Sequence, residues 1–149
     1  MPENKIDPEQ TYRTLLIIWA ALVASQFFFV VMLFVLKPEL FKFEFTEPLL
    51  GANPIILLIG GAFAVSNLVL SFVLRKRFLD KSVNEQNIGL VQTAMIAGCA
   101  LCESLSMVGL ITATVANYQY FFIFFAGGMI GMLFHMPRRS DIDAASFRR

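Results

Sequence analysis

The sequence has little charge, two cysteines, one histidine and one tryptophan among its 149 residues. Charged residues make up 15% of the chain, whereas a soluble domain carries about 25%. This deficit, together with 57% hydrophobic residues and a mean hydropathy of +0.68, excludes an ordinary soluble domain. A net charge of +1 gives no reason to expect nucleic-acid binding.

Several signatures of known chemistry are also missing. The two cysteines, Cys99 and Cys102, lie in one apolar run and do not form the disulfide framework of a small secreted protein. The chain contains no H-E-x-x-H, P-loop or G-x-S-x-G pattern, which would indicate a zinc protease, a nucleotide hydrolase or a serine hydrolase. Apart from the lone C-x-x-C pair no spacing suits a metal, so we expect no cofactor.

What the sequence does contain is four long apolar runs, separated by short polar segments. A helix needs roughly 20 apolar residues to cross a bilayer, and the runs predict spans at about 15–36, 54–74, 88–115 and 118–136. The first run is too long for a cleaved signal peptide, so we expect it to be retained. The predicted fold is an all-α membrane protein with one four-helix transmembrane domain and a charged tail at 137–149.

The distribution of Lys and Arg predicts the orientation of these spans. All of them except Lys37 and Lys42 lie in the N-terminal head, the connection between the second and third spans, or the tail. By the positive-inside rule both termini are cytoplasmic, and the third span runs outward. We expect a multi-pass protein of the cell inner (plasma) membrane, whose first partner is the lipid bilayer.

One acid, Glu103, lies deep inside a span. An ionisable side chain at the bilayer centre costs at least about 2.5–3.5 kcal/mol on insertion scales, so it usually has a task or a partner. A carboxyl that is neutral against lipid and ionised in a polar path can carry an ion across a membrane. The alternative is a protonated Glu103 that only hydrogen-bonds to a neighbouring helix. As polar partners in an ion-binding site we predict Ser104 beside it, and Ser66 and Asn67 in the second span.

Small residues in the last three spans predict close helix packing, as in small-xxx-small interfaces of membrane helices. The glycines expected to pack are Gly60, Gly61, Gly98, Gly109, Gly127 and Gly131. Two other polar side chains carry weaker expectations. Gln26 is expected to hydrogen-bond between helices, and His135 to lie at the membrane interface near lipid headgroups.

The segment from Gly98 to Ala113 resembles the ion-binding helix of rotor-ring subunit c of rotary ATP synthases. Its pattern is G-x-A-x-x-E-S-L-x-x-x-G-L-I-x-A, with the carboxylate at Glu103 and the second glycine at Gly109. The resemblance implies that Glu103 carries a proton or a sodium ion, assisted by Ser104. It also implies a homo-oligomer or a subunit of a membrane complex. It covers about 16 residues, and spans one and four have no counterpart in the single helical hairpin of that family.

Two other functions are kept open. The chain could be a non-catalytic structural or assembly subunit of a larger respiratory or energy-transducing complex. It could also be a thiol-disulfide oxidoreductase, since four-helix membrane oxidoreductases such as the vitamin K epoxide reductase family resemble it in size and span count. That family needs a second, shuttle pair of cysteines, which this chain lacks. No catalytic residue is predicted, and enzyme activity is left undecided.

Overall fold

A computed structural model describes residues 7–42, 48–50 and 54–146, and every regular element in it is a helix. In chain order these are α1 (Pro8–Leu36), η1 (Pro38–Phe41), α2 (Pro54–Glu85), α3 (Ile88–Ala116), η2 (Gln119–Phe121), α4 (Phe122–Phe134) and α5 (Arg139–Ser146). The all-helical prediction is therefore confirmed for the described residues.

Helices α1, α2 and α3 are long and apolar enough to cross a membrane. A fourth span is obtained if η2 and α4 are taken together with α5, which is bent from them by 44°. The chain thus has the helices of a membrane protein, and the number of four spans remains a prediction.

Polar caps and tight turns define the helix ends. Asp7 caps α1 by accepting a hydrogen bond from the backbone N–H of Glu9 (3.0 Å), and Asn87 caps α3 in the same way through Gly89 (2.9 Å). Asn117 ends α3 in the left-handed conformation, with φ 49°, which asparagine tolerates better than most residues. The last two apolar runs are therefore joined by a tight turn, and α3 and α4 pack together as a hairpin.

Two polar segments are more ordered than the sequence suggests. Helix α2 continues past Leu74, where the apolar run ends, through the basic segment to Glu85. Lys and Arg are good helix formers, and Lys81 forms an ion pair with Glu85 one turn later (3.6 Å). Both effects favour continuation of the helix beyond the apolar run. The predicted tail contains α5, whose Ile142 and Ala145 are buried against the bundle.

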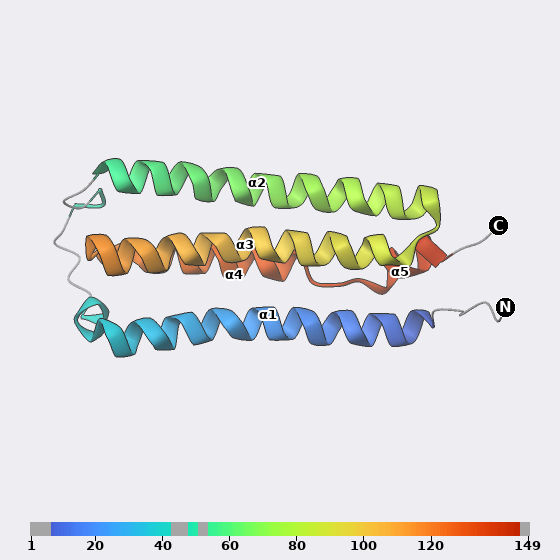
Figure 1. Cartoon of the computed structure of the whole chain (residues 1–149), viewed down its shortest axis with the longest axis horizontal. Helices are drawn as coiled ribbons and strands as arrows, with labels where there is room; N and C mark the ends of the chain where they lie inside the picture. The colour runs from blue at the N-terminus through green and yellow to red at the C-terminus, as the bar shows by residue number, and fades with distance from the viewer. Residues whose placement is uncertain (1–6, 43–47, 51–53, 147–149) are drawn as a thin grey trace.

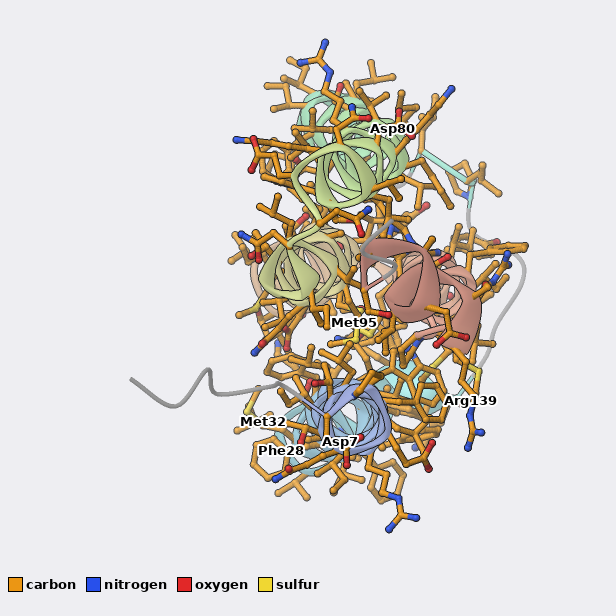
Figure 2. All side chains as sticks on the ribbon, turned by 90° about the vertical axis from the view of Figure 1, so that its right-hand side faces the viewer. Asp7, Phe28, Met32, Asp80, Met95 and Arg139 are labelled. Atoms are coloured by element: carbon orange, nitrogen blue, oxygen red, sulfur yellow. The ribbon has the colours of Figure 1, made fainter. Side chains whose placement is uncertain are left out.

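The helices are arranged around α3. Figure 1 shows α1 and α2 on either side of it with α4 alongside, and Figure 2 shows the same arrangement from the end of the bundle. Half of the apolar window of α3 is buried, against 11% for α1 and 17% for α2. The start of α1, the α2–α3 turn and α5 all lie at one end (Figure 1). That this end faces the cytoplasm remains a prediction.

The apolar core is divided into two clusters along the bundle. The cluster nearer α5 includes Leu15, Val91, Met95, Cys99, Cys102, Met132, Ile142 and Ala145. The cluster at the other end includes Leu33, Leu40, Leu57, Ala113, Tyr118, Phe121 and Phe125. Between the two clusters, two pairs of polar residues join α1 and α3: Ser25 with Glu103, and Gln26 with Ser106. We call these four residues the polar seam.

Candidate functional site

Glu103 lies almost at the centre of α3, the most buried of the three long helices. It is one residue past the midpoint of α3 (Ile88–Ala116), about 22 Å from its start at a rise of 1.5 Å per residue. A bilayer core is about 30 Å thick, so a spanning α3 carries this carboxyl far from either surface. The residue is half-buried, at the rim of the contact between α1 and α3.

The hydrogen-bond partner of Glu103 is Ser25 on α1. The Ser25 hydroxyl lies 2.9 Å from Glu103 Oε1 and 2.7 Å from the backbone carbonyl of Leu22. A hydroxyl has one proton to donate and two lone pairs to accept with. Ser25 can therefore donate to an ionised Glu103, or accept the proton of a neutral Glu103 while donating to Leu22. The same geometry suits both protonation states.

The second pair of the polar seam joins the same two helices. The hydroxyl of Ser106 on α3 donates to Gln26 Oε1 on α1. Gln26 is 1% exposed and Ser106 is fully buried. The Gln26 Nε2 group, however, has no hydrogen-bond partner among the described residues. The expected hydrogen bond of Gln26 to another helix is thus present, and among the described residues only the carbonyl oxygen of its side chain takes part.

The three predicted polar partners of Glu103 are placed elsewhere. Ser104 is half-buried and donates to the carbonyl of Leu101 in its own helix (2.7 Å). Ser66 is exposed on α2 and Asn67 is half-buried. No hydrogen bond found among the described residues links Ser66, Asn67 or Ser104 to Glu103. Their ion-binding role remains a prediction, and the structure supplies Ser25 instead.

The reason lies in how α2 and α3 align. Ser71 on α2, and not Ser66 or Asn67, is beside Cys102, with its Oγ 3.7 Å from Cys102 Sγ. Gly60 lies beside Val108, more than one helical turn beyond Glu103 along α3. Because α2 continues as a helix through the basic segment to Glu85, the register between α2 and α3 cannot be counted from the end of the apolar run.

The predicted packing glycines divide into two groups. A Cβ at Gly109 or Gly60 would lie 3.0 Å from Phe124 or Val108, and one at Gly131 would lie 2.6 Å from Cys102 Sγ. These glycines and Gly98 therefore allow close approach between helices of this chain. Gly127 has only an ordinary contact with Leu105 (3.5 Å), and nothing lies within 4 Å of a Cβ at Gly61. Gly128, which was not predicted, is closer to α3 than Gly127 is: a Cβ added at Gly128 would lie 2.8 Å from the Cys102 carbonyl oxygen.

His135 is the residue that the sequence misplaced. It ends α4 and is fully buried, not exposed to headgroups. Its Nδ1 lies 2.7 Å from the Gly131 carbonyl, and its ring lies 4.9 Å from the ring of Phe72. A Cβ at Gly98 would lie 2.5 Å from His135 Nε2, so the ring occupies the space that the glycine leaves on α3. This contact joins two residues that are far apart in sequence, and no local sequence pattern predicts it.

The cysteine pair lies next to this histidine. Cys102 Sγ is 4.0 Å from His135 Nδ1, whereas the sequence places no histidine near the C-x-x-C pair. Both thiols are unpaired and fully buried. A redox thiol is usually partly exposed in an electropositive setting, so this environment is typical of structural cysteines. Within residues 7–42, 48–50 and 54–146, no group of three His, Cys, Asp or Glu side chains is placed to hold a metal ion.

Arg75 closes the end of the bundle near His135. Its guanidinium donates to the carbonyls of Phe134 and Met136, on either side of the histidine, and to Asp141 of α5 at 3.4 Å. Trp19 on α1 also reaches α4, donating to the Met132 carbonyl at 2.9 Å. These contacts use carbonyls near the C-terminal end of α4, which has no further helical turn to satisfy them.

Comparisons of the whole chain with protein-family models, with curated proteins and with solved structures find no match. The function is therefore inferred from the site itself. Its distinctive feature is one half-buried carboxyl at mid-helix, hydrogen-bonded to a single hydroxyl that can serve either protonation state.

Proposed function

We propose that this chain is a membrane protein that carries a proton on Glu103. The observation that supports this most directly is the Ser25 hydroxyl, which lies within hydrogen-bond distance of both Glu103 Oε1 and the Leu22 carbonyl. A carrier must be stable with and without its proton, and this arrangement gives the carboxyl a partner in each state. A carboxyl retained only for structure has no need of a partner that can reverse its role.

The surroundings favour exchange of a proton by Glu103. The apolar parts of the helices around it, residues 14–36, 54–74 and 119–134, contain no Lys, Arg, Asp or Glu. An ionised carboxylate without a neighbouring cation is costly in hydrocarbon, so Glu103 is expected to be neutral against lipid and to ionise where water reaches it. Its half-buried position at the rim of the α1–α3 contact leaves one side open for this exchange.

A proton is a better cargo than sodium for this site. Sodium sites in membrane proteins are built from several oxygen ligands, often with unwound backbone carbonyls. Among the described residues one side-chain oxygen, that of Ser25, is hydrogen-bonded to Glu103, and α3 is a continuous helix on both sides of it. Proton transfer needs no more than this pair and a path for water.

The resemblance of residues 98–113 to rotor-ring subunit c supports the same role for Glu103. The partner comes from α1, however, and not from α2, the helix that forms the hairpin with α3. We therefore propose a subunit-c-like carboxylate within a four-helix protein of the inner membrane. The proposal includes assembly of several copies of the chain, and the mass of the purified complex tests this.

A structural or assembly subunit is the second candidate function. The observation that favours it is the breadth of apolar surface on the two outer helices, with side chains such as Phe28 and Val35 on α1 and Ile55 and Val65 on α2 exposed. Partner helices could cover this surface, as lipid could. The glycines that approach other helices closely do so within the chain, so a partner would pack on α1 or α2.

The deciding experiment compares Glu103→Gln with Glu85→Gln in proteoliposomes. Glu85 is a matched control because its side chain is 51% exposed at the end of α2. We expect Glu103→Gln to abolish both proton flux and modification by a hydrophobic carbodiimide, which reacts with protonated carboxyls. Glu85→Gln should retain both. Undiminished flux in folded Glu103→Gln would refute the carrier and leave the structural role.

A further inference from the structure

The polar seam contains one polar group that the pairs described above leave unused. Gln26 Nε2 is buried in a residue that is 1% exposed, and it has no acceptor among the described residues. A buried donor left without an acceptor destabilises the folded protein. An apolar side chain of similar size would avoid this cost, so the amide at this position calls for an explanation.

The placement of Gln26 suggests which group uses it. It follows Ser25, the partner of Glu103, and its own carbonyl oxygen is held by Ser106. Ser106 is three residues after Glu103, and side chains three apart on a helix are neighbours, with about 5–6 Å between their Cβ atoms. The Gln26 amide is therefore held at the α1–α3 contact, next to the turn of α3 that carries the carboxyl.

We propose that Gln26 is a positioning residue that donates its Nε2–H to Glu103 when the carboxyl is ionised. Ser25 then supplies one donor and Gln26 the second, and the carboxylate is held by α1 from two adjacent positions. When Glu103 is protonated it needs no second donor, and the amide stays with Ser106. This inference rests on the proposed role of Glu103 and adds the group that stabilises its charged form.

Other charged and titratable groups lie on the helices around this contact, and Cys99 is one turn before Glu103. On α3 they are Cys99 and Cys102, on α4 His135 beside Cys102, and on α2 Arg75 at the end of the bundle. On α1 no Lys, Arg, Asp, Glu or His occurs between Arg13 and Lys37. The neutral donors Ser25 and Gln26 are therefore what α1 offers to a carboxylate at this depth. A hydrogen bond to the charged form of a carboxyl favours that form.

The test is the pH dependence of carbodiimide labelling at Glu103, in proteoliposomes containing the full chain. Labelling needs the protonated carboxyl, so the pH at which it falls to half reports how readily Glu103 ionises. We expect Gln26→Leu to raise this midpoint by about one pH unit, since the charged form loses a donor. Ser106→Ala is the matched control: it breaks the same Gln26–Ser106 bond but keeps the amide, and its midpoint should not rise.

The outcomes separate the inference from the function. A midpoint unchanged in Gln26→Leu, or raised equally in Ser106→Ala, overturns the role of Gln26. If Gln26→Leu does not fold, Gln26→Asn retracts the amide by one methylene and should raise the midpoint in the same direction; an unchanged midpoint there also overturns it. Proton flux is measured separately. If flux is undiminished in Glu103→Gln while Gln26→Leu still raises the labelling midpoint, the carrier is refuted and the Gln26–Glu103 contact stands.

Discussion

Replacing Gly98 with alanine tests the closest contact between α3 and α4. The added Cβ would lie closest to His135 Cδ2 and 2.5 Å from Nε2, whereas ordinary contact begins at 3.4 Å. The ring has little freedom to retreat, because Nδ1 is held by the Gly131 carbonyl at 2.7 Å and Phe72 packs beside it. The end of α4 must therefore move away from α3 by about 1 Å or the ring must leave its site.

The cost follows from two opposing terms. Overpacking a filled core costs about 1–3 kcal/mol, and replacing glycine by alanine inside a helix returns about 0.5–1 kcal/mol. Because the added Cβ overlaps the ring severely, the upper part of the overpacking range applies, about 2–3 kcal/mol, and Gly98→Ala should destabilise the protein by about 1–2.5 kcal/mol. Gly61→Ala is the matched control, since nothing lies within 4 Å of its Cβ, and it should be neutral or slightly stabilising.

The assay is reversible unfolding in mixed micelles, followed by circular dichroism for each single variant and for Gly98→Ala combined with His135→Ala. The penalty of Gly98→Ala should largely disappear in the His135→Ala background, because the two sites are coupled through direct contact. If Gly98→Ala behaves like Gly61→Ala, or if its penalty is the same without the imidazole, the reasoning about this contact is refuted.

Three further variants test other contacts. Arg75→Gln should release α5 and speed its proteolytic removal several-fold, because the guanidinium bonds Phe134, Met136 and Asp141; Arg77→Gln, on an exposed neighbour, should not. Trp19→Phe should lose the bond to the Met132 carbonyl and about 1 kcal/mol of stability in the same unfolding assay, and an unchanged midpoint would contradict the contact. Cys99→Ser combined with Cys102→Ser should keep the proton flux of Glu103, whereas its loss in a folded variant would revive the thiol redox alternative.

The long helices were predictable because their signals are local. The apolar runs are long enough for spans, and Asp7, Asn87 and Asn117 lie where helices begin and end. A charged segment does not by itself end a helix, which is why α2 runs on to Glu85 and why α5 forms within the expected tail. The depth of a residue, counted along its own helix from the end of an apolar run, does not give the register between two packed helices.

The site was predictable only in its central residue. Glu103 is recognisable because a lone acid in an apolar run is expensive. Its partner was not, since Ser25 is 78 positions away and an isolated serine in an apolar run is common in membrane helices. His135 shows the same limit, because its burial depends on the space left by Gly98 across the α3–α4 contact. Long-range packing decides both, and one sequence carries little trace of it.

The peripheral position of α1 has a consequence for how the protein is assembled in the bilayer. Helices α2, α3 and α4 follow one another through short turns, so they can form a unit as they are inserted. Helix α1 is connected to that unit by segment 37–53, and it joins α3 and α4 through Trp19, the polar seam and its residues in the two core clusters, Leu15 and Leu33. The docking of the first helix to be synthesised is therefore expected to be the last step of folding, and the carboxyl of Glu103 receives its hydrogen-bond partner only when that step is complete.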